Sequence, residues 1–182
     1  MRKIFYITGN SYKFKNAKKY AKKFGFDLVQ KKLNIKEIQS GSIENIAKEK
    51  ARQAFKILNK PLIVSDSGWN IPSLKGFPGP YMQYINQWFR SEDFLKLIKD
   101  KKDKSIILEH IICAISSKGS KLFKQRIKGK FINRSRGIGL PSDRVVLLGK
   151  SKNTIAEAQN KNKESVDDTN LWKKVYQWSK RI

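Results

Sequence analysis

The sequence predicts an α/β protein with a mixed β-sheet, and three observations lead to this fold class. In the first third of the chain, short apolar runs typical of strands alternate with apolar stripes at helical spacing. Two long strand-like segments, residues 104–116 and 121–133, are then joined by a short turn, as in a β-hairpin. The 182 residues suffice for one domain with a sizeable core but not for two ordinary domains.

The first half of the chain alternates strands and helices. The turn Gly9-Asn10 closes the first strand, Gly25 stops the first helix, and Ser42 is expected to cap the second helix. The last strand is a short, continuous apolar run, as in a strand covered on both faces. The expected elements are strand 2–8, a helix with the stripe Phe14, Ala17, Ala21 and Phe24, strand 27–33, helix 43–58 and strand 62–64.

The second half begins with a stretch rich in glycine and proline, residues 66–81, which is expected to consist of turns. Apolar periodicity then returns, first at helical and later at strand spacing. The expected elements are helices near 82–89 and 91–99, strands near 104–116, 121–133 and 144–148, and a terminal helix with the stripe Leu171, Val175 and Trp178.

The charge balance points to an anionic partner. Lys and Arg number 40 against 15 Asp and Glu, a net charge of +25, so a nucleotide, a nucleic acid or an acidic surface is expected. The hydrophobic fraction of 39% excludes a disordered polycation. We expect neither a membrane span nor a signal peptide, and the lone Cys113 favours a cytoplasmic setting. Cys113 and the lone His110 lie in one apolar run and are expected to be core residues.

A strand-to-helix turn near the N-terminus has the composition of a phosphate site. Thr8-Gly9-Asn10 leads into the first helix, where free backbone amides and the helix dipole favour an anion, and Lys13 adds a positive charge. The spacing differs from that of a Walker A loop. A helix N-cap without any ligand explains the same residues equally well.

The carboxylates offer few candidates for a metal site. Asp66 follows the buried strand 62–64, and a tight turn at Ser67-Gly68 is expected to point its side chain outward. Glu37, in the loop after the second strand, could reach the same sheet edge. Mg²⁺ is usually held by one or two carboxylates together with phosphates and water. The alternative is a turn aspartate that hydrogen-bonds its own backbone.

Two further features carry charge or shape. The loop 74–81 places two prolines around a glycine, which favours a rigid turn with Phe77 and Tyr81 against a base or the core. In the second hairpin strand every other residue is a cation, so that one strand face is wholly basic: Lys124, Arg126, Lys128 and Lys130. This face either binds an anion or is simply solvated.

Three motifs in this order resemble the inosine triphosphate pyrophosphatase family, enzymes that hydrolyse non-canonical purine nucleoside triphosphates. They are Thr8-Gly9-Asn10 with Lys13, then Asp66-Ser67-Gly68 leading to the loop 74–81, and then the glycine-containing stretch 129–139. Ala156-Glu157 followed by Lys161 or Lys163 is similar to the family's C-terminal stretch. The resemblance extends over nearly the whole chain, which is therefore identified as a divergent member.

The resemblance implies an elongated mixed β-sheet flanked by helices, in two lobes with a central cleft. Residues 1–182 would form this single domain, and the subunit would form a homodimer. Glu37 and Asp66 would hold Mg²⁺, while Asp66 and Lys13 would be the catalytic residues. A water activated by a carboxylate and the metal would attack the α-phosphorus, releasing pyrophosphate and a nucleoside monophosphate. The substrate-binding residues would be Thr8, Gly9, Asn10, Lys13, Ser67, Gly68 and Lys163.

The sequence also departs from the pattern of that family. Ser65 stands where the family has a second carboxylate, and Asn16 replaces an acid. Residues 139–142, Gly-Leu-Pro-Ser, replace Gly-Trp-Asp-Pro, and residues 167–169, Asp-Asp-Thr, replace the purine-recognising Ser-His-Arg. We therefore expect altered recognition of the base from the changes at 139–142 and 167–169. The loss of two carboxylates is expected to weaken either metal binding or the basicity of the site at the α-phosphate.

Three hypotheses follow. The leading one is a Mg²⁺-dependent nucleoside triphosphate pyrophosphatase with altered base recognition. The alternative is a catalytically impaired member that binds nucleic acid or a ribonucleoprotein through its basic surface, with an affinity that falls steeply with salt. The third is that the abundance of lysine reflects an AT-rich genome and has no functional meaning.

Overall fold

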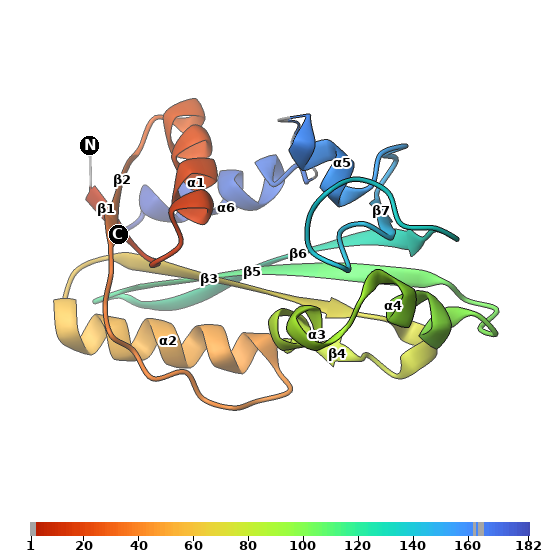
Figure 1. Ribbon diagram of the computed structural model, residues 1–182. Helices are drawn as coiled ribbons and strands as arrows, with labels where there is room; N and C mark the ends of the chain where they lie inside the picture. Colours follow the sequence, from red (N-terminus) through yellow and green to blue (C-terminus); the bar gives the residue numbers. More distant parts are fainter. Residues whose placement is uncertain (1–2, 162, 164–165) are drawn as a thin grey trace. The chain divides into compact units, whose positions relative to one another are not determined.

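Figure 1 shows the computed structural model of the protein, which describes residues 3–161, 163 and 166–182. In chain order its elements are β1 (Lys3–Ile7), α1 (Ser11–Phe24), β2 (Asp27–Lys31), α2 (Ile43–Leu58), β3 (Leu62–Asn70), the 3₁₀ helix η1 (Pro72–Leu74), β4 (Pro78–Gly79), α3 (Met82–Trp88), α4 (Ser91–Ile98), β5 (Ser105–Ser116), β6 (Gly119–Phe131), β7 (Val146–Leu148), α5 (Ile155–Asn160) and α6 (Thr169–Ser179). None of the helices in these residues is long and apolar enough to cross a membrane.

Seven strands of the described residues form one sheet in the order β2-β1-β3-β5-β6-β7, with β4 paired to β3 outside this path. β1 runs parallel to both β2 and β3, whereas β4 is antiparallel to β3 and β7 is antiparallel to β6. The sheet is therefore mixed, and helices flank it (Figure 1). The predicted α/β fold class with a mixed sheet is confirmed.

The chain divides into two compact units. Unit 1 consists of the described residues of Met1–Asp66, His110–Gln125 and Asp168–Ile182, and unit 2 consists of those of Ser67–Glu109 and Arg126–Asp167. The single two-lobed domain over residues 1–182 stays a prediction.

In unit 1, helices cover both faces of the strands, with α1 and α6 on one side and α2 on the other (Figure 1). Period-2 alternation along β1 explains this, because Tyr6 faces the core formed with α1 and α6 while its neighbour Ile7 faces α2. Trp172 of α6 stacks on Tyr20 of α1, with 5.9 Å between ring centroids and 7° between planes. Three alanines, Ala47, Ala51 and Ala54, form the stripe with which α2 packs on the strands.

Unit 2 has its own core, which packs α3, α4 and α5 on the ends of the central strands. Phe94 of α4 and Ile106 of β5 are fully buried there, and Phe131 ends β6 in the same cluster. The short α5 was not expected from apolar periodicity. Its start is fixed by a capping box. The side chain of Thr154 accepts a hydrogen bond from the Glu157 amide, and the side chain of Glu157 accepts one from the Thr154 amide.

The expected turn at Ser67-Gly68 is wrong. β3 continues through this segment to Asn70, because Trp69 and Asn70 pair with Gly79 and Pro78 of β4. Gly68 is buried within the strand. The turn therefore begins after Asn70, and Asp66 lies in the middle of a nine-residue strand.

Candidate active site

The loop between β1 and α1 forms a capped helix start with free amides. The side-chain oxygen of Asn10 accepts the amide of Lys13 at 3.0 Å, and Thr8 Oγ1 accepts the amide of Asn10 at 3.1 Å. The amides of Ser11 and Tyr12 lie in the first turn, where a helix offers no backbone acceptor. These two donors and the helix dipole can bind one anion, such as a phosphate group.

The same loop is anchored to β2 and open beside Gly9. The backbone of Thr8 bonds twice to β2: its amide donates to the Lys31 carbonyl at 3.1 Å, and its carbonyl accepts from Gln30 Nε2 at 3.1 Å. A side chain added at Gly9 would meet no atom within 4 Å. The loop is therefore held in place while its exposed side is accessible to a ligand.

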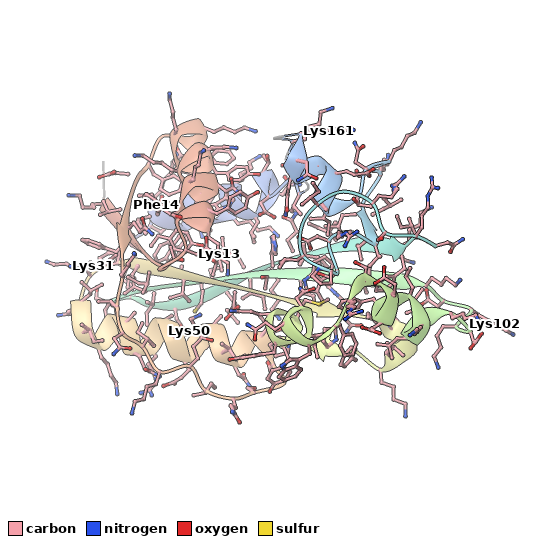
Figure 2. All side chains as sticks on the ribbon, viewed as in Figure 1. Lys13, Phe14, Lys31, Lys50, Lys102 and Lys161 are labelled. Atoms are coloured by element: carbon pink, nitrogen blue, oxygen red, sulfur yellow. The ribbon has the colours of Figure 1, made fainter. Side chains whose placement is uncertain are left out.

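Lys13 lies at the start of α1 (Figure 2). Its side chain is half-buried. Burial lowers the pKa of its ammonium; the charges of Asp66 and Glu37 raise this pKa, while Lys50 lowers it. These influences place Lys13 in one charged cluster with Asp66, Lys50 and Glu37, all of them in unit 1. Burial disfavours the protonated form of Lys13, so a phosphate that binds beside it would stabilise that charged form.

Lys50 lies on α2 (Figure 2). Its ammonium contacts two of the predicted carboxylates. Its Nζ lies 2.7 Å from Glu37 Oε1 and 3.5 Å from Asp66 Oδ2. The side chains of Lys50 and Asp66 are each 19% exposed, whereas that of Glu37 is 60% exposed. Burial alone would lower the pKa of Lys50, but Asp66 and Glu37 outweigh it and raise the pKa above its ordinary value. The predicted proximity of Glu37 and Asp66 is thus explained by a shared cation.

Lys50 was missed by sequence reasoning, although the sequence carries a signal for it. It follows Ala47 by three residues and precedes Ala51, so it borders the apolar stripe of α2. A lysine on the packed side of a helix needs a carboxylate partner. The chain has many lysines, and the place of Lys50 beside this apolar stripe is the feature that distinguishes it from the solvated ones.

Next to Asp66, Ser65 occupies the position where a second carboxylate was expected from the resemblance. Its hydroxyl is hydrogen-bonded to the hydroxyl of Tyr6 in β1. Burial raises the pKa of Tyr6 to about 12, the charges of Asp168 and Asp66 act in the same direction, and the bond to Ser65 opposes them. Tyr6 is therefore a neutral phenol, and the negative charges of Asp168 and Asp66 both favour its protonated form.

The cluster suits Mg²⁺ only with further ligands from a substrate. No group of three or more His, Cys, Asp or Glu side chains arranged to hold a metal occurs in the part of the chain that the structure describes. Glu37 and Asp66 nevertheless provide two hard carboxylates at one point, as their common contact with Lys50 shows. This donor set fits Mg²⁺, which needs few protein ligands when phosphates and water complete its shell.

A comparison with known proteins decides the family. The sequence model of the Ham1 family matches residues 4–169, which is most of the chain. The protein belongs to the Ham1 family.

The expected resemblance to inosine triphosphate pyrophosphatases is confirmed by curated relatives. The dITP/XTP pyrophosphatase of Methanosarcina mazei is 34% identical over 140 residues, which is 76% of each chain. That of Saccharolobus solfataricus is 33% identical over 156 residues, which is 85% of this chain and 81% of the relative.

Solved Ham1 structures share the fold. The Ham1 protein of Staphylococcus aureus superposes with a TM-score of 0.77 at 20% identity, covering 99% of this chain and 98% of that one. A HAM1 protein from Coxiella burnetii gives 0.80 at 19% identity and covers both chains completely. The mixed α/β architecture is therefore that of the Ham1 family.

The segment that differs from the family pattern at residues 167–169 makes contacts of its own in this Ham1 chain. Asp168 lies in front of α6, and its carboxylate contacts His110 Nδ1 on β5 at 3.0 and 3.1 Å. Its amide donates to the hydroxyl of Tyr20 at 3.1 Å. The expectation that His110 is a core residue is wrong, because a quarter of its side chain is exposed and it binds a carboxylate. Cys113 is buried as expected.

The remaining predicted site residues of this Ham1 chain lie in unit 2. Ser67 and Gly68 continue β3, and Lys163 is exposed, with its amide donating to the Ala158 carbonyl at 2.8 Å. In the same unit, the segment that replaces Gly-Trp-Asp-Pro is fixed at two points. Ser142 donates its amide to Asn86 Oδ1 at 3.0 Å, and the Pro141 carbonyl accepts from Ser91 Oγ at 3.0 Å.

Proposed function

We propose that this protein is a nucleoside triphosphate pyrophosphatase that converts a substrate to a nucleoside monophosphate and pyrophosphate. The observation that carries the proposal is the cluster of Lys13, Lys50, Glu37 and Asp66 beside the capped start of α1. It combines cations that suit a triphosphate with a carboxylate that can act as a base. The curated relatives are named dITP/XTP pyrophosphatases, and these names support the same reaction. They also support the assignment of this protein to the hydrolases.

In the proposed reaction, Lys13 and the amides of Ser11 and Tyr12 bind phosphate oxygens. Asp66 accepts a proton from the attacking water, whose oxygen forms a bond to the α-phosphorus. The bond between that phosphorus and the bridging oxygen breaks, and pyrophosphate leaves with the electron pair. Lys13 stabilises the negative charge that develops on the phosphate oxygens.

Lys50 is a positioning residue in this proposal, because it contacts the two carboxylates and not the substrate. Its ammonium fixes Asp66 Oδ2 and Glu37 Oε1. A base held within hydrogen-bond reach of its water is more effective than one that moves freely. Glu37 and Asp66 would also hold Mg²⁺. When bound, this ion neutralises phosphate charge and polarises the phosphoryl oxygens.

The other predicted substrate-binding residues keep their proposed roles. Thr8, Gly9 and Asn10 form the open loop at α1. Ser67, Gly68 and Lys163 stay proposed substrate-binding residues on the resemblance alone. The base preference is proposed to differ from that implied by the family pattern. A carboxylate, Asp168, bound to His110 stands in the segment that replaces the purine-recognising residues, and Leu140 replaces a tryptophan.

Pyrophosphate release tests the proposal. The purified protein with Mg²⁺ would be given dITP, XTP, ITP and the four canonical triphosphates, and pyrophosphate and monophosphate would be measured together. We expect release from at least one of them and its loss in Asp66→Asn. The matched control is Asp27→Asn, which removes an exposed carboxylate of β2. A folded protein that releases no pyrophosphate from any substrate would overturn the proposal.

We further propose a homodimer of the single domain 1–182, located in the cytoplasm. Two exposed aromatic rings on α3 support an interface: Tyr84 is 53% and Trp88 is 71% exposed, and their ring centroids lie 6.3 Å apart. The lone buried Cys113 supports a reducing compartment. Light scattering coupled to gel filtration would report the dimer, and Trp88→Glu is expected to shift it to the monomer.

A further inference from the structure

A pocket of about 710 Å³ in unit 2 is lined by cations. It lies where β6 and β7 end and the neighbouring loops begin. Its wall contains five cationic side chains and no acidic one: Lys130, Arg134, Arg136, Lys150 and Lys152. All five belong to the second unit, and none of them is among the residues of the proposed active site. The pocket is thus a separate concentration of positive charge.

Most of this charge is unbalanced, in contrast to the cations earlier on β6. Lys124 is ion-paired with Glu44, and Arg126 Nε lies 2.9 Å from Glu109 Oε1. In the pocket, Arg136 lies 3.3 Å from Glu157. Within residues 3–161, 163 and 166–182, no carboxylate comes within ion-pair distance of the other four pocket cations. An anion from solution would relieve the mutual repulsion of these four cations.

The pocket wall is held in place before any ligand arrives. Arg136 Nη2 donates to the Lys152 carbonyl at 3.0 Å, which ties the loop after β7 to the segment after β6. The amide of Gly149 donates to the Lys128 carbonyl at 2.9 Å, and Ser151 Oγ donates to the Asn153 carbonyl at 2.8 Å. A fixed backbone limits the conformational entropy that binding would remove. In the described structure, the buried Nε of Arg136 has no hydrogen-bond partner.

The lining indicates which anion the pocket suits. It contains no aromatic ring on which a base could stack, and its apolar side chains are Ile132 and Leu147. Recognition must therefore act on phosphate groups and not on bases. The row of cations continues outward along the exposed face of β6, where Lys128 precedes Lys130 by two residues. A chain of consecutive phosphates can follow such a row, which a single nucleotide cannot.

We infer that this pocket binds the sugar-phosphate backbone of a single-stranded nucleic acid without sequence preference. A single strand can bend into a concave site, whereas a duplex presents its phosphates on a stiff convex cylinder. Four unpaired cations that each neutralise one phosphate give a slope of about −3 in a plot of log affinity against log salt concentration. The inference does not depend on the proposed catalytic activity.

The test measures binding of a fluorescein-labelled oligouridylate of about 12 nucleotides by anisotropy over a range of salt concentrations. The triple variant Lys130→Gln, Lys150→Gln, Lys152→Gln removes three pocket cations. We expect its salt slope to fall by about two and its affinity at low salt to fall at least about tenfold. The matched control changes three exposed lysines of α1 in the same way: Lys15→Gln, Lys18→Gln and Lys22→Gln. Its binding is expected to stay near that of the natural protein.

Several results would overturn the inference. No binding of the oligouridylate at low salt would do so, as would equal losses in the two triple variants, which would show a diffuse effect of net charge. A duplex that competes as well as an unlabelled single strand would contradict the preference for single strands. Pyrophosphate release by the pocket variant is expected to be unchanged, so failure of the nucleic-acid inference and failure of the proposed activity are distinguishable.

Discussion

His110 Nδ1 lies 3.0 Å from Oδ1 and 3.1 Å from Oδ2 of Asp168, so a histidine of β5 is held by both oxygens of the carboxylate in front of α6. Both side chains are largely buried, with 25% and 18% exposed. The pair connects α6 to the sheet of unit 1, and the bond from the Asp168 amide to Tyr20 adds a connection to α1. Asp168 therefore has a structural role in addition to its place in the segment proposed for base recognition.

Removing the carboxylate of Asp168 should destabilise the protein. In Asp168→Ala, His110 loses its partner while it stays largely buried, which should lower the free energy of unfolding by about 1–3 kcal/mol. Asp168→Asn keeps an acceptor and should cost about 1 kcal/mol. Urea unfolding followed by tryptophan fluorescence measures both values, with Asp27→Asn as the control. Equal stability of Asp168→Ala and the natural protein would show that the pair contributes nothing.

Lys50 should affect the rate of pyrophosphate release more than substrate affinity. Lys50→Met leaves Glu37 and Asp66 without their shared cation, so we expect kcat to fall at least about tenfold while KM changes little, because Lys13 still binds the phosphates. Lys50→Arg should restore part of kcat, and Lys48→Met, an exposed change on the same helix, should have no effect. A rise in KM alone would instead place Lys50 in contact with the substrate.

The raised pKa of Tyr6 should be visible as a loss of stability at high pH. An unfolded tyrosine ionises near pH 10, while Tyr6 in the folded protein, with a pKa of about 12, still holds its proton. The unfolded state therefore binds fewer protons, and the free energy of unfolding should fall by up to about 3 kcal/mol as the pH rises through this interval. Urea unfolding of the natural protein and of Tyr6→Phe at several pH values isolates this contribution. The lysines titrate in both proteins, so a parallel decline in the two would refute the assignment.

Cys113 should be unreactive until the protein unfolds. Burial raises the pKa of its thiol to about 11, with a smaller opposing influence from Lys48, so little thiolate is present at neutral pH. Its side chain is only 1% exposed. At about pH 8, Ellman's reagent should not react with the native protein but should react with one thiol per chain in concentrated guanidinium chloride. Rapid labelling of the native protein would mean that β5 opens locally.

Local signals in the sequence predicted the regular elements best. The cap Ser42, the alanine stripe and Asn59 predicted α2 with the same bounds that the structure shows, because capping and periodicity act within one turn of helix. β3 was predicted too short, since its outer half depends on pairing with β4, which a glycine- and proline-rich composition hides. The helix α5 was not predicted, because its six residues are too few for a clear periodicity; the capping box of Thr154 and Glu157 is the local signal that could have found it.

The candidate site was predicted only in part for a similar reason. The phosphate loop and Asp66 stood out from their neighbours in the chain, whereas Lys50 was one lysine among many. Its contact with Asp66 joins residues 16 apart, and that of His110 with Asp168 joins residues 58 apart. Such contacts depend on which faces the strands and helices present to each other, and a pattern read along one segment contains no information about that.

The division into units has a consequence for how this protein can be taken apart. The boundaries fall inside β3, β5 and β6 and just before α6, so the polypeptide passes from one unit to the other four times. No single cut of the backbone can yield either unit as a continuous fragment. A chain that ends within β3, β5 or β6 would therefore leave both cores incomplete, because each unit takes strands from both sides of these boundaries. Each unit must close loops of many tens of residues before its packing is complete, which favours slow, concerted folding of the whole polypeptide.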